Sequence, residues 1–209
     1  MPFHPEILRA DQQKLLAALG PWATARGFYL AGGTALALHL GHRESADFDW
    51  FGPDPILDPA ALVREIETTA KAAFQPTQRL EPGTVVGLVS QVKASFFRYQ
   101  YALLDATVDF GPCVLASLRD LAAMKLSAIY DRGSKRDFID VHALLGDSGL
   151  AYLIAQFRAK YPQGSVPHLL RALEYFDDAQ EEPMPRMSRR VAWAAVKRKL
   201  AREVAAYGG

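Results

Sequence analysis

The sequence predicts an α+β fold in which a mixed half with strands and helices precedes an all-helical part. Short runs rich in aromatic and β-branched residues alternate with helical patterns as far as residue 115. Beyond this point the apolar residues recur only at helical spacing. Half of the 209 residues are hydrophobic and 22% are charged, which supports a sizeable core and excludes a disordered or fibrous chain.

The first half contains the helical and strand patterns in alternation. Gly20-Pro21 and Gly41 are expected to end helices, and Gly32-Gly33 to form a tight turn between a strand and a helix. In order, we expect a helix at 5–19, a strand at 28–31, a helix at 34–40, a strand at 47–51, a helix at 60–74 and two or three antiparallel strands within 78–101.

The second half is expected to be helical. Ser117 and Ser134 are each followed three residues later by Asp, which is a weaker form of the capping box at a helix start. The expected helices cover 117–131 and 134–145, followed by three from residue 150 on, separated by 162–167 and by 177–185. We therefore expect an α/β core at 1–115 and a helical region at 116–209.

The formal net charge of +1 conceals an uneven distribution. Residues 1–112 carry 9 basic and 12 acidic side chains, whereas residues 113–209 carry 15 basic and 11 acidic ones. No uncharged run approaches the ~20 apolar residues of a membrane span, and the N-terminal residues lack the pattern of a signal peptide. We expect a cytoplasmic protein that binds no membrane. The single cysteine, Cys113, has no disulfide or zinc partner in the sequence and is expected to be a small buried side chain.

Asp47 and Asp49 are the first candidate site residues. In a strand they share one face, while Phe48 and Trp50 share the other. Two neighbouring carboxylates repel each other unless they are solvated or bind a divalent cation, and their hard oxygen atoms suit Mg²⁺. A solvent-facing edge strand with its aromatic side chains packed inward explains the same pattern.

The glycine pair lies where a strand precedes a helix N-terminus. Gly32 and Gly33 let a ligand approach the backbone, and together with Thr34 they begin a helix whose free amides bind phosphate. Arg43 and Ser45, on the segment that leads to the aspartates, are further candidate phosphate ligands. Alternatively, the glycines only form a tight turn, and Arg43 and Ser45 are surface or capping residues.

Lys125 lies on the apolar stripe of its expected helix, where a buried ammonium needs a partner. It reaches phosphates or an acidic residue, or it extends past the helix edge to solvent. Arg136 and Asp140 lie four residues apart and are expected to pair across one helical turn, although a solvated helix start has the same appearance.

The last helix, expected over 188–207, is basic. Residues 186–203 carry seven basic side chains and one acidic one. This pattern indicates contacts with RNA phosphates or, alternatively, a solvated helix face with cations near its C-terminus.

Two of these segments resemble motifs of a known family. The segment 30–51, LAGGTALALHLGHRESADFDWF, resembles the first motif of the AbiEii/AbiGii toxin-like nucleotidyltransferases, which have the DNA polymerase β-like nucleotidyltransferase fold. The segment 118–140, LRDLAAMKLSAIYDRGSKRDFID, resembles the lysine motif and the Arg-Asp-x-x-Asp motif of that family. The two blocks occur in the family's order, and the resemblance spans about residues 28–145.

The resemblance implies a nucleotidyltransferase-like mixed β-sheet with helices on one side. It implies a nucleoside triphosphate held with Mg²⁺ and a nucleotidyl group transferred to an acceptor. In some members the acceptor is tRNA and the protein is a toxin that has a cognate antitoxin protein. In this arrangement Asp47 and Asp49 hold the metal, the segment 32–34 binds the phosphates, with Arg43, Ser45 and Arg136 as further nucleotide ligands, and Lys125 offsets charge on the leaving pyrophosphate.

One departure concerns a third carboxylate, which enzymes of this fold carry on a neighbouring strand. The expected strand holds Ser95 near that position and no acidic residue. Asp109 is the nearest substitute, with Asp105 as the alternative. The sequence is therefore consistent with an active nucleotidyltransferase or with a nucleotide-binding or partner-binding member that lost the reaction. A glycosyltransferase that uses Asp-x-Asp is a third hypothesis, but it leaves the lysine block without a role.

Overall fold

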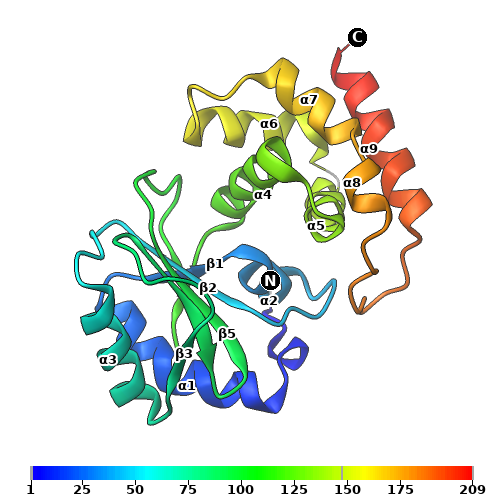
Figure 1. The fold of residues 1–209 in the computed structure, drawn as a ribbon. Helices are drawn as coiled ribbons and strands as arrows, with labels where there is room; N and C mark the ends of the chain where they lie inside the picture. The colour runs from blue at the N-terminus through cyan, green and yellow to red at the C-terminus, as the bar shows by residue number, and fades with distance from the viewer. Residues whose placement is uncertain (1, 147, 209) are drawn as a thin grey trace.

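A seven-stranded mixed sheet forms the first half of the computed structural model, which describes residues 2–146 and 148–208 (Figure 1). The strand order is β3-β4-β5-β2-β1-β7-β6. The strands are β1 (Tyr29–Ala31), β2 (Phe48–Gly52), β3 (Phe74–Pro76), β4 (Thr84–Val89), β5 (Val92–Arg98), β6 (Val108–Asp109) and β7 (Val114–Leu115). Strand β2 lies in the middle of the sheet, antiparallel to β1 and parallel to β5, so the predicted acid–aromatic strand is not at an edge.

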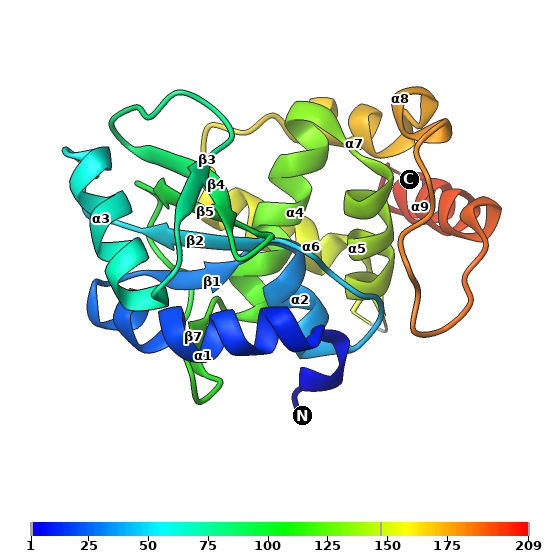
Figure 2. The same cartoon turned by 60° about the horizontal axis from the view of Figure 1, so that its bottom comes forward.

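Helices α1 and α3 cover one face of the sheet, and the helices from α4 on form a helical layer beside it. Figure 2 shows α1 running beneath β1 and β2. The helices are α1 (Ala10–Ala25), α2 (Gly32–Leu40), α3 (Pro59–Ala70), α4 (Leu118–Arg132), α5 (Lys135–Leu145), α6 (Gly149–Lys160), α7 (Val166–Glu174), α8 (Asp177–Gln180) and α9 (Trp193–Gly208), and a 3₁₀ turn spans Pro5–Ile7. The predicted fold class is confirmed.

Two hydrophobic cores correspond to the sheet and to the helical layer. The first contains Phe48, Trp50 and Phe96 on the face that α1 and α3 cover. The second contains Phe138 and Phe157 among helices α4 to α9. Helix α4 contributes side chains to both cores, so the division into regions 1–115 and 116–209 stays a prediction.

The expected end of the first helix at Gly20-Pro21 is wrong, because α1 continues to Ala25. A Cβ atom at position 20 would lie 2.5 Å from the carbonyl oxygen of Pro112, so Gly20 permits close packing of the helix on a loop. The apolar stripe continues to Ala23, which is fully buried. Tertiary packing therefore outweighs the local tendency of Gly-Pro to end a helix.

The predicted helix starts at Ser117 and Ser134 are confirmed. The Ser117 hydroxyl accepts a hydrogen bond from the backbone N–H of Asp120. Ser134 and Asp137 form a reciprocal capping box at the start of α5. These caps fix the orientation of the two helices that carry Lys125 and Asp140.

Helix α9 begins at Trp193, so the expected helix start at residue 188 is wrong. The N–H of Glu44 donates to the carbonyl of Arg186 at 2.8 Å, and the N–H of Ser188 donates to the carbonyl of His42 at 3.1 Å. These bonds hold the basic segment against residues 42–44 instead of allowing it to form helical hydrogen bonds. Across residues 2–146 and 148–208, no single helix has both the length and the apolar composition of a membrane span.

Candidate functional site

The two aspartates of the first motif lie at the start of β2. Phe48 and Trp50 are completely buried under α1 and α3, so Asp49 faces away from these helices. Gly32 has a φ of +64°, and a Cβ atom there would lie 2.6 Å from Oδ2 of Asp49. Glycine is therefore required for the carboxylate of Asp49 to approach the N-terminus of α2.

Asp49 is an electrostatically costly carboxylate. Burial raises the pKa of Asp49, and the neighbouring charge of Asp47 raises it further. The Ser95 hydroxyl and the charges of Lys125 and Lys93 act in the opposite direction without cancelling the effect. A cation bound beside Asp49 would relieve this unfavourable charge.

The start of α2 also meets Arg43 and Ser45. A Cβ atom at Gly33 would lie 2.5 Å from Nη2 of Arg43 and 3.2 Å from Oγ of Ser45. The structure thus brings the predicted phosphate ligands Gly32, Gly33, Arg43 and Ser45 together at one helix N-terminus. Free amides, a guanidinium and a hydroxyl are the groups that bind phosphate oxygens.

Thr34 lies in the first turn of α2, as predicted, and its side chain has a partner within the protein. Its side chain is buried, and its hydroxyl donates a hydrogen bond to the backbone carbonyl of Asp47. The side chain of Gln12 donates to the backbone carbonyl of Ser45 at 2.8 Å. The Thr34 hydroxyl therefore positions the aspartate loop, and phosphate binding by the segment 32–34 stays a prediction.

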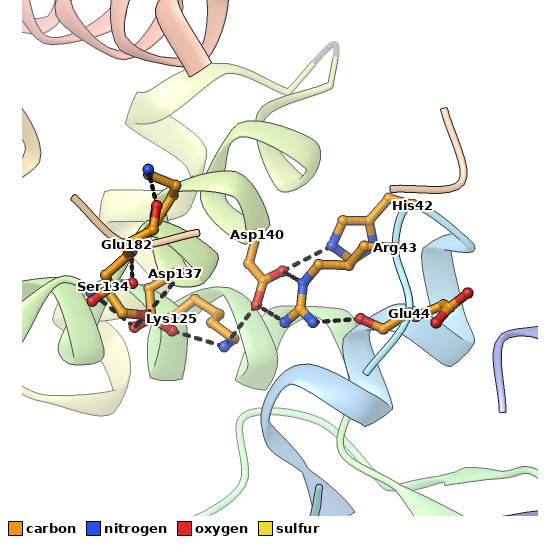
Figure 3. Close-up of polar contacts among 9 residues, drawn as sticks. His42, Arg43, Glu44, Lys125, Ser134, Asp137, Asp140 and Glu182 are labelled. Carbon is orange, nitrogen blue, oxygen red and sulfur yellow. Dashed lines mark hydrogen bonds and ion pairs between the residues drawn. The ribbon is translucent and has the colours of Figure 1, made fainter. Parts of the chain in front are cut away.

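Asp140 is the centre of a buried ionic cluster that joins the sheet to the helical layer (Figure 3). Nε and Nη2 of Arg43 donate to its two oxygens at 2.6 and 2.8 Å. Nζ of Lys125 lies 2.7 Å from Oδ2, and Nε2 of His42 lies 2.8 Å from Oδ1. Lys125 also donates to Asp137 at 2.9 Å. Among the alternatives expected for Lys125, the structure shows contact with acidic residues.

These contacts determine the charge states of the cluster. Burial opposes ionisation of Asp140, but Lys125, Arg43 and His42 hold its pKa far below the usual value. Burial likewise opposes a charge on Lys125, and the carboxylates of Asp140 and Asp137 raise its pKa above the usual value. Lys125 is consequently a firmly protonated amine near Asp49.

Arg136 does not pair with Asp140, which is the correction to the expected contact across one helical turn. Asp140 points to Arg43 and Lys125 instead, and Arg136 is exposed. Arg136 does line a cavity of about 370 Å³ next to the start of α2. The cavity is lined by Arg9, Gln12, Arg43, Glu44, Ser45, Ala46, Arg136, Pro185 and Arg186. It therefore unites the predicted nucleotide ligands Arg43, Ser45 and Arg136 with two further arginines.

Asp109 lies too far from the aspartate pair to be the third carboxylate. It belongs to β6, which is three strands away from β2, a separation of about 14 Å. Its Oδ1 accepts a hydrogen bond from the N–H of Gly111 at 2.8 Å and so stabilises its own turn. Ser95 is the direct partner of Asp49 on β5. Within the described part of the chain, no group of three or more His, Cys, Asp or Glu residues is arranged to hold a metal.

Gln12, His42 and Asp137 are site residues that the sequence reasoning did not single out. Gln12 is completely buried three residues before Leu15 on the apolar stripe of α1. The rule that singled out Lys125, a polar residue on an apolar stripe, identifies Gln12 equally well. Its partner, the carbonyl of Ser45, leaves no such local signal.

The basic terminal helix lies on the side of the helical layer away from the sheet (Figure 1). Val196, Leu200 and Val204 form its buried stripe, and Arg198 and Arg202 are exposed. The segment before α9 reaches the site through the pairing of residues 186–188 with residues 42–44. Contact of α9 itself with RNA stays a prediction.

The chain is similar to known proteins in sequence and in fold. The family model described as "Nucleotidyl transferase AbiEii toxin, Type IV TA system" matches residues 109–207, which include the lysine and Arg-Asp-x-x-Asp motifs. The chain is 35% identical over 181 residues to Uncharacterized protein aq_aa25 of Aquifex aeolicus, with 84% of this chain and 86% of the relative covered.

Two solved structures show the same fold. MenT4, a nucleotidyltransferase toxin of Mycobacterium tuberculosis, superposes with a TM-score of 0.54 at 17% identity, covering 94% of this chain and 86% of its own. JHP933 of Helicobacter pylori has a TM-score of 0.54 at 15% identity, covering 98% and 92%. The two motifs, the match of the family model and the 35% identical relative identify the chain as a member of the AbiEii nucleotidyltransferase toxin family.

Proposed function

We propose that this chain transfers a nucleoside monophosphate from a nucleoside triphosphate to an acceptor hydroxyl. The observation that carries the proposal is the approach of three groups: the free N-terminus of α2, the Asp49 carboxylate and the Arg43 guanidinium. A phosphate site directly beside the electrostatically costly carboxylate of Asp49 is an arrangement that a metal-bound triphosphate would satisfy.

The triphosphate is oriented by the distribution of positive charge. The β- and γ-phosphates lie at Gly33 and Ser45 and extend into the cavity lined by Arg9, Arg136 and Arg186. The α-phosphate lies beside Asp47 and Asp49. This orientation matches each part of the ligand to groups of opposite charge, because the cavity holds the arginines and the start of β2 holds the acids.

Mg²⁺ fits the donor set of the aspartate pair. The lysine of the site pairs with Asp137 and Asp140, so among the described residues neither Asp47 nor Asp49 has an ion-pair partner. Two hard carboxylate oxygens, completed by phosphate oxygens of the substrate, form a typical Mg²⁺ site. When bound, the ion would neutralise the triphosphate and polarise the α-phosphorus.

In the transfer step the acceptor oxygen bonds to the α-phosphorus, and the bond from that phosphorus to the bridging oxygen of the β-phosphate breaks. Pyrophosphate leaves with the electron pair, and the acceptor proton passes to solvent. Asp140 holds Lys125 and Arg43 at fixed positions from which their charges offset the charge of the leaving group. Phosphoryl transfer depends mainly on such positioning and electrostatics, so it places a small demand on a general base.

The family description and the positive charge of α9 support a proposal for the acceptor and for the biological role. We propose that the acceptor is RNA, with tRNA as the first candidate, and that the protein is a toxin restrained by a cognate antitoxin protein. The family description supports the toxin role, and the exposed Arg198 and Arg202 of α9 support a polyanionic acceptor.

Incubation with each α-labelled nucleoside triphosphate, Mg²⁺ and total RNA tests the proposal. We expect label to enter RNA, and Asp47→Ala and Asp49→Ala each to reduce incorporation by about 100-fold or more, because the metal contribution is several kcal/mol. Asp131→Ala, at an exposed position on α4, is the matched control. Incorporation that is independent of Asp47 and Asp49 would refute the proposal.

A catalytically inactive member is the second candidate, because Ser95 lies opposite Asp49, where the fold family carries an acidic residue. Such a protein would bind the triphosphate and Mg²⁺ without transferring label. Isothermal titration with each triphosphate, run beside the incorporation assay, separates the two functions. Binding that Asp49→Ala abolishes, in the absence of any labelled product, would favour the inactive member.

A further inference from the structure

The segment 44–47, between α2 and β2, belongs to no helix or strand, but it carries the candidate ligands Ser45 and Asp47. Nε2 of Gln12, a side chain of α1, donates a hydrogen bond to the carbonyl of Ser45 at 2.8 Å. The hydroxyl of Thr34 donates to the carbonyl of Asp47. Both donor side chains are completely buried, so the segment, which we call the aspartate loop, is held in place from the protein interior.

Gln12 lies in the first turn of α1, and both ends of its amide are paired. Its Oε1 accepts a hydrogen bond from the backbone N–H of Arg9 at 3.1 Å, while its Nε2 binds the carbonyl of Ser45. Because the oxygen only accepts and the nitrogen only donates, these two partners fix the orientation of the amide. One buried side chain therefore links the start of α1 to the aspartate loop, 33 residues further along the chain.

Helix capping explains only one of these two bonds. The bond from the N–H of Arg9 satisfies a backbone donor that has no partner inside the helix, and a glutamate would accept it equally well. The donor bond to the Ser45 carbonyl contributes nothing to the start of α1. Gln12 shares the buried stripe of this helix with Leu15 and Leu16, where an amide costs free energy unless it is paired. A glutamine at this position therefore indicates a role in the aspartate loop.

The backbone position that Gln12 holds determines where the Ser45 hydroxyl lies. Oγ of Ser45 is 3.2 Å from the point that a Cβ atom at Gly33 would occupy, beside the free N-terminus of α2. Within the described part of the chain this hydroxyl makes no hydrogen bond, and Gln12 and Ser45 both line the cavity of about 370 Å³. A shift of the Ser45 backbone would therefore move one of the groups proposed to bind phosphate in this cavity.

We propose, on the basis of the triphosphate site proposed above, that Gln12 is a positioning residue for this site. It touches no reacting atom and acts through the backbone of Ser45, which it holds so that the Ser45 hydroxyl and the amides of α2 bind the same phosphate group. A loop that is ordered before the ligand arrives binds more tightly, because the cost of ordering it is not subtracted from the binding free energy. Loss of the Gln12 donor lowers the affinity for the triphosphate without changing the transfer step.

Isothermal titration with Mg²⁺ and inorganic triphosphate tests this proposal, because the probe occupies a phosphate site whatever base the substrate carries. We expect Gln12→Leu to weaken binding about 10-fold, since the net contribution of one hydrogen bond to a charged group is of this order. Gln12→Glu keeps the acceptor for α1 and lacks the donor for the loop, so we expect it to bind at least as weakly. Urea denaturation verifies that each variant is folded. Wild-type affinity in either variant overturns the proposal.

Two other glutamines provide matched controls. Gln13→Leu changes the same turn of α1, where the Gln13 side chain donates to the carbonyl of Leu8 at 3.0 Å. Gln156→Leu changes a buried amide on α6 whose two ends are paired with Arg119 and with a backbone carbonyl. We expect both variants to bind the probe with wild-type affinity. A loss as large as that of Gln12→Leu would overturn the proposal, because the effect would not depend on the aspartate loop.

A double-mutant cycle with Ser45→Ala separates positioning from a general loss of packing. Ser45→Ala removes the hydroxyl and is expected to weaken binding by a similar factor. In that background Gln12→Leu is expected to add less than about 3-fold, because both changes remove the same contact. Independent effects that multiply would overturn the proposal.

The incorporation assay provides a kinetic readout that keeps this inference separate from the proposed function. We expect Gln12→Leu to raise KM for the triphosphate about 10-fold and to leave kcat nearly unchanged, whereas a fall in kcat at constant KM would overturn the positioning role. Equal binding of the probe by the wild type and Gln12→Leu, with normal incorporation of label, would refute this inference alone. Binding that depends on Gln12 without any labelled product would refute nucleotidyl transfer alone. Failure of the wild type to bind the probe would refute both.

Discussion

Asp120 and Asp140 are two completely buried carboxylates on successive helices, and each contacts a lysine. Asp120 receives Nζ of Lys160 at 2.7 Å, the Ser117 hydroxyl at 2.6 Å and the N–H of Leu104 at 2.9 Å. Lys160 also donates to the carbonyl of Ala102 at 2.8 Å, and its side chain is completely buried. This closed pair ties the loop after β5 to helices α4 and α6.

The Asp140 cluster is built from the same chemistry but is not closed. Lys125 and Arg43 lie between Asp140 on one side and the aspartate pair on the other, and their charges act on Asp49 and Asp47 respectively. The Lys125 side chain is 10% exposed, whereas that of Lys160 is not exposed at all. The Asp120–Lys160 pair therefore stabilises the fold, whereas the Asp140 cluster holds positive charge beside the candidate site.

Lys160→Met gives the largest expected effect and removes the closed pair. The ionised Asp120 stays buried with only neutral donors, which costs about 3–5 kcal/mol of the free energy of unfolding. Urea denaturation measures this loss. We expect the remaining folded protein to transfer nucleotides at nearly the wild-type rate, because the partners of Lys160 are Ala102, Asp120 and the ring of Tyr99, none of which belongs to the Asp140 cluster or the phosphate site.

The matched control for Lys160→Met is the double variant with Asp120→Asn, which removes both charges. We expect it to be less destabilised than the sum of the single variants, because no uncompensated charge is left. Strict additivity of the two changes, or a loss of nucleotide transfer equal to that of an aspartate variant, would contradict a purely structural pair.

Lys125→Met should produce the reverse pattern, with a small loss of stability and a large loss of nucleotide transfer. Arg43 and His42 continue to satisfy Asp140, so we expect a stability loss of only about 1 kcal/mol. Nucleotide incorporation should fall by about 100-fold or more, because one preorganised positive charge is lost from the transition state. Urea denaturation and the labelled-triphosphate assay measure the two quantities on the same preparation.

Lys135→Met is the matched control, since Lys135 is also buried but donates to the backbone carbonyl of Gln180 and lies over Trp193. It should lose stability and keep its activity. If Lys125→Met unfolded as readily as Lys160→Met while its transfer rate stayed unchanged, the distinction between the two clusters would be wrong.

Features with a local signature could be predicted from the sequence. The change from an aromatic run to Gly-Gly marked β1 and α2, and alternation of acids and aromatics marked β2. Lys125 was found because a charged residue on an apolar stripe needs a buried partner. Each of these signals depends on spacing within a few residues.

The hydrogen-bond and ion-pair partners of the site residues could not be predicted, because they come from distant parts of the chain. Arg43 and Asp140 are 97 residues apart, and Gln12 and Ser45 are 33 apart. The expected pairing of Arg136 with Asp140 was wrong because a strong distant partner displaced a weak local one. The assignment of Asp109 as the third carboxylate was wrong for a related reason, since the order of the strands in the sheet does not follow their order in the sequence.

Asp49→Asn is expected to increase stability slightly, and it extends the comparison to a partly buried carboxylate that has no ion-pair partner among the described residues. The folded state binds a proton at Asp49 more tightly than the unfolded chain does, because burial and Asp47 raise its pKa, so the ionised form costs stability at neutral pH. We expect Asn to increase the free energy of unfolding at pH 7 by about 0.5–2 kcal/mol while abolishing transfer. As the pH falls through the raised pKa toward the ordinary value of 3.8, the wild-type carboxylate becomes protonated and the stability advantage of Asn disappears.

Urea unfolding of both proteins without divalent cations, with Asp131→Asn as the control, measures this difference. A gap that widened on acidification would mean that the Asp49 charge stabilises the free protein and that the site does not favour a cation.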